Sequence, residues 1–92
     1  MIEKTDTSSE GIMSKRLEDM RKNPRGNWKI SDVEALCKEF GVFCQPPRGG
    51  GSHYKIAHPR LADKPSIPFR RPIKPTYIWD LVDFIDRVIL LP

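Results

Sequence analysis

The sequence predicts one α+β domain with the element order α-β-β-β-α, in which two helices cover one face of a three-stranded antiparallel sheet. Apolar residues recur at helical spacing over residues 31–40 and 75–89, and residues 52–58 alternate between apolar and polar side chains as in a half-buried strand. A chain of 92 residues is long enough for one small hydrophobic core and too short for two.

The segment before this domain is predicted to be an arm. Residues 1–26 are assigned to a flexible or partly helical arm, and residues 27–92 to the compact domain. The first twelve residues are polar and have no apolar period, so we expect them to be disordered. A short helix capped by Ser14 fits the spacing of Leu17 and Met20, and an Asn-Pro pair ends it.

The first helix of the domain is predicted from Ser31 to Phe40. Ser31 and Glu34 have the spacing of a capping box, and Gly41 ends the helix as a left-handed cap. The apolar residues of one face lie three and four positions apart: Ile30, Val33, Leu36, Cys37 and Phe40.

Three short strands are predicted between the helices, at residues 42–44, 52–58 and 66–69. Short connections join them, so they form an antiparallel meander. The connection at residues 46–51 is rich in proline and glycine and includes Arg48, which predicts a long cationic hairpin loop.

The second strand has one face for the core and one for solvent. Tyr54 and Ile56 are predicted to point toward the core, whereas His53 and Lys55 lie on the exposed face. The aromatic residues of the strands are interpreted as core side chains rather than platforms for stacking bases: Phe43, Tyr54 and Phe69.

The last helix has the clearest apolar stripe, with Pro75 in its first turn. The stripe consists of Ile78, Leu81, Val82, Ile85, Val88 and Ile89. Trp79 and Phe84 fall outside it on opposite flanks, together with Leu90 and Leu91. These residues either extend the core or form a surface for a partner.

Positive charge is concentrated between residues 45 and 75, where seven cationic residues face one acidic residue, Asp63. The cations are Arg48, Lys55, Arg60, Lys64, Arg70, Arg71 and Lys74. The whole chain carries a formal charge of only +4, so this segment is a candidate for binding an anion such as a phosphodiester. An ordinary solvated surface is the alternative.

The run Gly49-Gly50-Gly51-Ser52-His53 is the most unusual local feature. Glycines allow another backbone to approach closely and leave N–H groups free for an anion. The spacing fits neither a Walker A loop nor a dinucleotide-binding fingerprint. Histidine is the side chain suited to proton transfer near neutral pH, so His53 could take or give a proton in RNA cleavage. Alternatively, it is a polar residue at an exposed strand start.

The remaining candidate ligands are interpreted as structural. His58 is predicted to be a hydrogen-bonded structural histidine, and Cys37 and Cys44 to be buried thiols. These residues lack zinc-like spacing, so neither a metal nor another cofactor is expected. We find neither a secretory signal nor an apolar run long enough to cross a bilayer, which predicts a cytoplasmic protein.

A set of short motifs, in a fixed order between about Ile30 and Ile89, resembles the HicA-type mRNA interferase toxins of bacterial type II toxin–antitoxin pairs. The motifs are Gly51-Ser52-His53, then Tyr54-Lys55-Ile56-Ala57-His58-Pro59, Ile67-Pro68 and Lys74-Pro75-Thr76. The resemblance implies a fold similar to double-stranded RNA-binding domains and a ribosome-independent endoribonuclease that acts on mRNA.

The resemblance also implies roles for particular residues. His53 corresponds to the catalytic histidine, and a HicB-like antitoxin is the implied partner, with Trp79 and Phe84 as candidate contacts. The expected RNA-binding residues are Arg48, Gly50, Gly51, Ser52, Lys55, Arg70, Arg71 and Lys74. A non-catalytic RNA-binding module and a protein-interaction subunit that docks on an acidic partner remain alternatives.

Overall fold

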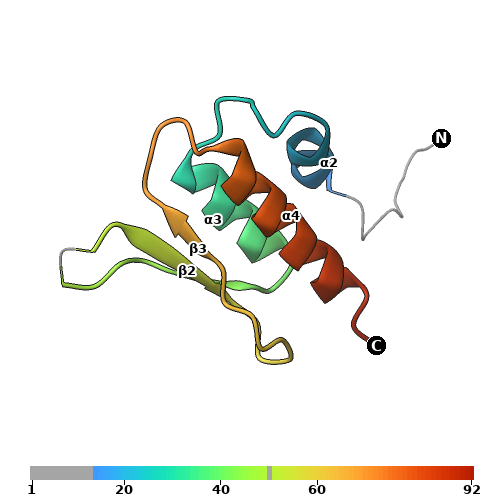
Figure 1. Ribbon diagram of the computed structural model, residues 1–92. Helices are drawn as coiled ribbons and strands as arrows, with labels where there is room; N and C mark the ends of the chain where they lie inside the picture. Colours follow the sequence, from blue (N-terminus) through green and yellow to red (C-terminus); the bar gives the residue numbers. More distant parts are fainter. Residues whose placement is uncertain (1–13, 50) are drawn as a thin grey trace.

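A computed structural model describes residues 14–49 and 51–92. Its elements are α2 (Lys15–Lys22), α3 (Ile30–Glu39), β1 (Phe43–Gln45), β2 (His53–Ala57), β3 (Ser66–Pro68) and α4 (Pro75–Ile89). Helices α3 and α4 lie between the sheet on one side and α2 on the other (Figure 1). The predicted α+β class and the α-β-β-β-α order are confirmed, with one additional helix before them. The predicted disorder of residues 1–12 lies outside the described residues.

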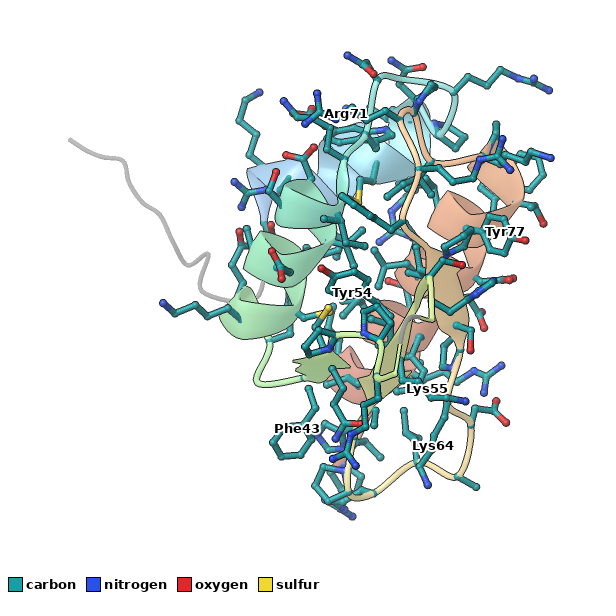
Figure 2. All side chains as sticks on the ribbon, turned by 90° about the vertical axis from the view of Figure 1, so that its left-hand side faces the viewer. Phe43, Tyr54, Lys55, Lys64, Arg71 and Tyr77 are labelled. Atoms are coloured by element: carbon teal, nitrogen blue, oxygen red, sulfur yellow. The ribbon has the colours of Figure 1, made fainter. Side chains whose placement is uncertain are left out.

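The sheet has the strand order β1-β2-β3, and β2 pairs antiparallel with both neighbours. Ile56 and Ile67 are fully buried and face the helices. Directly paired residues point to the same face of a sheet, so the register also defines the opposite face, which we call the outer face. It consists of Phe43, Gln45, His53, Lys55, Ala57, Ser66 and Pro68. Figure 2 shows Phe43 on this side, away from the helices.

Helix α3 begins one residue earlier than predicted. Its N-cap is Lys29, whose N–H donates to the Asp32 carboxylate at 2.9 Å. The predicted cap at Ser31 is therefore wrong, because the helix already includes Ile30, which packs against the core. The predicted end is confirmed, since Gly41 follows the helix with a φ of 66°.

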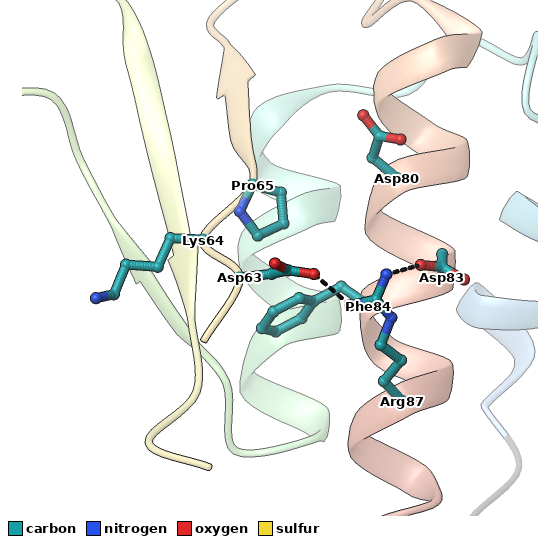
Figure 3. Close-up of a pocket in the computed structure, with 7 residues that line it drawn as sticks. All are labelled: Asp63, Lys64, Pro65, Asp80, Asp83, Phe84 and Arg87. Atoms are coloured by element: carbon teal, nitrogen blue, oxygen red, sulfur yellow. Dashed lines mark hydrogen bonds and ion pairs between the residues drawn. The ribbon is translucent and has the colours of Figure 1, made fainter. Parts of the chain in front are cut away.

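Helix α4 begins at Pro75 as predicted, and its apolar stripe forms a large part of the core. Phe84 is only 2% exposed, so its predicted role as a partner contact is wrong. The connection between β2 and β3 passes over that flank of the helix and brings Pro65 beside the Phe84 ring (Figure 3). Trp79 remains 54% exposed on the opposite flank.

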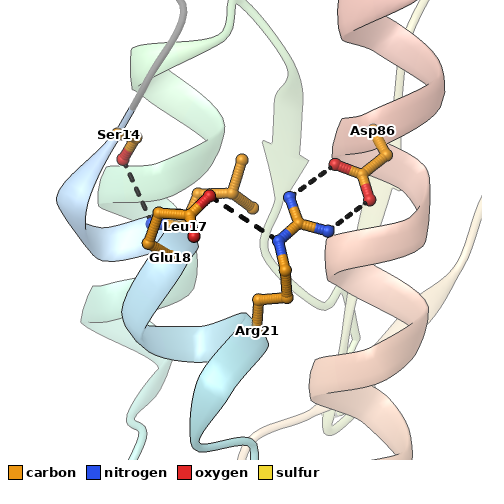
Figure 4. A network of polar contacts seen from close by, with 5 residues as sticks. All are labelled: Ser14, Leu17, Glu18, Arg21 and Asp86. Carbon is orange, nitrogen blue, oxygen red and sulfur yellow. Dashed lines mark hydrogen bonds and ion pairs between the residues drawn. The ribbon is translucent and has the colours of Figure 1, made fainter.

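Helix α2 belongs to the compact domain and not to a separate arm. Leu17 and Met20 are 3% and 0% exposed and join the central core. The Ser14 hydroxyl caps the helix by accepting from the Leu17 N–H at 3.1 Å, as predicted. Arg21 donates two hydrogen bonds to the Asp86 carboxylate of α4, at 2.7 and 2.8 Å (Figure 4). The predicted domain boundary at residue 27 is therefore too late.

Candidate active site and nucleic-acid surface

His53 is the first residue of β2 and is exposed on the outer face, opposite Pro68 of β3. The ladder extends one step further, where the Phe69 N–H donates to the Ser52 carbonyl at 2.7 Å. The Ser52 hydroxyl oxygen lies 3.4 Å from His53 Nδ1. The backbone of His53 is thus held by the sheet, while its side chain can be reached from solvent.

The connection from β1 to β2 turns tightly next to His53. Gly49 has a φ of 57°, and the Gly51 N–H donates to the Arg48 carbonyl at 3.0 Å. A Cβ at Gly51 would lie 3.2 Å from that carbonyl oxygen, so a glycine suits the close approach. Gly50 lies outside the described residues. This turn keeps Arg48 at the same end of the sheet as His53.

Antiparallel pairing gathers part of the predicted cationic set at this end. The end of β3 lies beside the start of β2, so Arg70, two residues after Pro68, emerges close to His53. Lys55 occupies the next outer-face position of β2, about 7 Å along the strand. Together with Arg48 in the loop, these cations lie toward the same end of the sheet as the exposed histidine, as the sequence predicts.

The other two predicted cations lie elsewhere. Lys74 is the N-cap residue of α4. Figure 2 shows Arg71 near the top of the view and Lys55 in its lower half. The predicted set therefore extends from the hairpin end of the sheet, with Arg48, Lys55 and Arg70, along the path to α4, with Arg71 and Lys74.

The ion pairs of the described residues use four cations, Lys15, Arg16, Arg21 and Arg87, and none of these lies at His53. The described ion pairs lie on or beside the helices: Lys15–Asp19, Arg16–Glu39, Arg21–Glu18, Arg21–Asp86, Arg87–Asp63 and Arg87–Asp83. Asp63, the one acidic residue of the cationic segment, pairs with Arg87 of α4, and hydrogen bonding to Asp63 raises the pKa of Arg87. None of the cations at His53 pairs with a carboxylate of residues 14–49 or 51–92. No carboxylate of the described residues therefore competes with an external anion for these cations.

The aromatic residues of the sheet differ from the prediction. Phe43 is 57% exposed, because the register places it on the outer face opposite Ala57 and gives the core position to Cys44. Phe69 is 59% exposed just beyond the end of β3. Its ring contacts that of half-buried Tyr54, with centroids 6.3 Å apart and planes tilted by 59°. The predicted core positions of Phe43 and Phe69 are wrong.

His58 has a structural environment, as predicted. It is half-buried, and its Nδ1 accepts a hydrogen bond from the Arg60 N–H at 3.1 Å. It lies five residues beyond His53, about 16 Å along an extended strand. The two imidazoles therefore cannot act on the same phosphodiester group.

The two cysteines are free thiols that contact each other between α3 and β1. Cys37 is buried, as predicted, but Cys44 is only half-buried. Hydrogen bonding to Cys44, and then burial, raise the pKa of Cys37, whereas hydrogen bonding from Cys37 lowers the pKa of Cys44. The described residues contain no cluster of three or more histidine, cysteine or acidic side chains able to hold a metal ion.

A pocket of about 270 Å³ lies between α4 and the connection from β2 to β3 (Figure 3), and His53 is not among the residues that line it. Its lining includes the carboxylates of Asp63, Asp80 and Asp83. Two of them already pair with Arg87. The lining also includes the cations Lys64 and Arg87, but three carboxylates against two cations make this pocket less suited to a phosphate than the end of the sheet at His53.

Comparisons with protein-family models, curated proteins and solved structures found no significant match to this chain. The likeness to HicA toxins therefore rests on the motifs in the sequence. None of the described helices is long and apolar enough to cross a membrane.

Proposed function

We propose that this protein is a small, metal-independent endoribonuclease that cleaves mRNA with His53 as its catalytic residue. The observation that carries the proposal is an exposed imidazole toward the same end of the sheet as Arg48, Lys55 and Arg70, whose charges have no carboxylate partner among the described residues. An RNA phosphate is an anion of suitable chemistry for such a surface.

In the proposed reaction, neutral His53 removes the proton from a ribose 2′-OH, and the 2′ oxygen attacks the adjacent phosphorus. The bond from phosphorus to the 5′ oxygen breaks, and this oxygen takes a proton from solvent. Nearby Lys55 and arginine side chains stabilise the negative charge of the transition state. The products carry 2′,3′-cyclic phosphate and 5′-OH ends.

The motif resemblance extends the proposal to a toxin of a type II toxin–antitoxin pair that acts in the cytoplasm. A free ribonuclease harms its own cell, so the proposal includes a HicB-like antitoxin. Such a partner inhibits by covering His53 or by offering carboxylates to the surrounding cations. Exposed Trp79 is the proposed apolar anchor, since aromatic residues often dominate binding energy at interfaces.

The test is cleavage of a defined RNA by purified protein in EDTA, with analysis of the product ends. His53→Ala should lower the rate by about 100-fold or more. His58→Ala is the matched control and should leave the rate within a few-fold of the original, because His58 lies too far along the strand. Unchanged cleavage by His53→Ala, or loss of cleavage in EDTA, would contradict the proposal.

A non-catalytic RNA-binding module is the second candidate. It is favoured by the surroundings of His53, where Ser52 is the one side chain among the described residues that lies within hydrogen-bonding distance. This candidate predicts salt-dependent RNA binding without cyclic phosphate products, so the same cleavage assay separates the two functions.

A further inference from the structure

The outer face of the sheet combines an exposed aromatic ring with positive charge in a defined order. Along β2 it presents His53, Lys55 and Ala57, and Phe43 of β1 is the cross-strand neighbour of Ala57. Successive positions on one face are about 7 Å apart, so Phe43 lies about 14 Å from His53 along the strand direction, with Lys55 between them.

The Phe43 ring is not part of the hydrophobic core. The ring is 57% exposed, and the neighbouring position that faces the core belongs to Cys44. None of the seven outer-face residues is acidic. The one ionised group of fixed charge among them is the Lys55 ammonium, which has no described carboxylate partner.

An aromatic ring and a cation on an open sheet face match the chemistry of a single-stranded nucleic acid. Unpaired bases present their flat faces to aromatic side chains, and the phosphates between them pair with cations. The bases of a duplex stack on each other and cannot offer those faces. A protein partner could also bury the Phe43 ring, but it would need carboxylates to complement Lys55, whereas a single strand of RNA supplies both flat bases and anionic phosphates.

We infer that the outer face of the sheet binds single-stranded RNA, with Phe43 stacked on a base and Lys55 on a phosphate between that base and the cleavage point. Phe43 is thereby a positioning residue that selects unpaired RNA. The inference rests on the proposed function only in taking His53 as the place of cleavage. The binding surface itself does not depend on catalysis.

The test measures binding of a fluorescently labelled single-stranded oligonucleotide of 2′-O-methyl RNA, which has no free 2′-OH and cannot be cleaved by the proposed reaction. Phe43→Ala should weaken binding by about 5-fold to 100-fold, the usual cost of losing one stacked base. Phe43→Trp should restore it. Circular dichroism should confirm that both variants are folded, because the substituted side chain is exposed.

Phe69 provides a matched control. It is 59% exposed, as much as Phe43, but it belongs to the helix-facing side, where it contacts Tyr54. Phe69→Ala should bind the oligonucleotide within about twofold of the original protein. A self-complementary duplex of the same composition should bind more weakly and should not respond to Phe43→Ala.

The outcomes separate this inference from the proposed catalysis. If Phe43→Ala binds the single strand as well as the original protein, or if Phe69→Ala loses as much affinity, the inference is overturned. If Phe43→Ala binds weakly but His53→Ala still cleaves RNA, the binding surface is supported and the catalytic proposal fails.

Discussion

Replacing Met20 by alanine should destabilise the whole domain, although Met20 precedes the segment that the sequence marks as compact. Its side chain is 0% exposed and packs into the same core as the residues of α3 and α4. Truncation of a fully buried methionine to alanine costs about 2–5 kcal/mol. A domain of this size has about 5–15 kcal/mol of total stability, so a large fraction would be lost.

Urea unfolding followed by tryptophan fluorescence measures this loss. Trp28 reports on the connection after α2, because its indole N–H donates to the Asn23 carbonyl at 2.8 Å. A loss of about 3 kcal/mol would lower the melting temperature by roughly 12 to 24 °C. Lys15→Ala is the control in the same helix, and it should change stability by less than about 0.5 kcal/mol, since that side chain is 90% exposed.

The reasoning is refuted if Met20→Ala unfolds within about 0.5 kcal/mol of the original protein. A separate early transition in the original protein would also contradict it, because α2 would then detach before the sheet and the other helices unfold. A single transition that shifts with the substitution supports one cooperative domain.

Two further predictions concern charge and thiol chemistry. Replacing Arg48 and Arg70 by alanine should reduce the slope of log RNA affinity against log salt concentration by about 0.7 for each lost phosphate contact. Replacing Arg16, which pairs with Glu39, should leave the slope unchanged. An unchanged slope in the double variant would place the RNA elsewhere. In native protein, Cys44 should react with iodoacetamide before Cys37, because the hydrogen bond from Cys37 lowers the pKa of Cys44. Its rate should reach half of the maximum at a pH below the pKa of an ordinary thiol. Faster labelling of Cys37, read by peptide mass spectrometry, would contradict the assignment.

Periodicity predicted the long elements well. The stripe of α4 and the alternation of β2 each repeat often enough to define a face, and Gly41 marks the end of α3. Helix α2 was harder to assign to the core, because Leu17 and Met20 are only two apolar residues and many exposed helices have as many. Their burial depends on α4 and α3, which the local sequence does not contain.

Short elements were where face assignment failed. In a strand of three residues, a shift of one position exchanges the buried and exposed faces. Phe43 therefore became an outer-face residue, while Cys44 took the core position. The prediction for Phe84 was wrong in the opposite sense, since a residue expected at the surface is buried. Its flank of α4 is covered by the connection from β2 to β3, whose path the helical pattern cannot predict.

At the candidate site, the sequence predicted the catalytic histidine and the cationic residues as candidates, but not which of these cations lie at the same end of the sheet as the histidine. The position of His53 at an exposed strand start followed from alternation, and the excess of cations followed from counting. The position of Arg48 and Arg70 toward the same end of the sheet as His53 depends on the antiparallel pairing of β2 with β3 and on the glycine turn. That Asp63 is paired with a residue of α4, leaving these cations without it, depends on tertiary structure alone.

The distribution of charge and the layers of the fold together favour one face for an anionic polymer. The side of α3 and α4 away from the sheet is occupied by α2, and α4 carries carboxylates that Arg21 and Arg87 only partly neutralise. On the outer face of the sheet Phe43, Gln45, His53 and Lys55 are exposed, and none of the seven residues of this face is acidic. A polyanion approaching the described domain therefore meets the carboxylates of α4 on one side and Lys55 without any carboxylate on the outer face, although α2 also carries more cations than carboxylates. This asymmetry would orient RNA toward the end of the sheet that carries His53 before any specific contact forms.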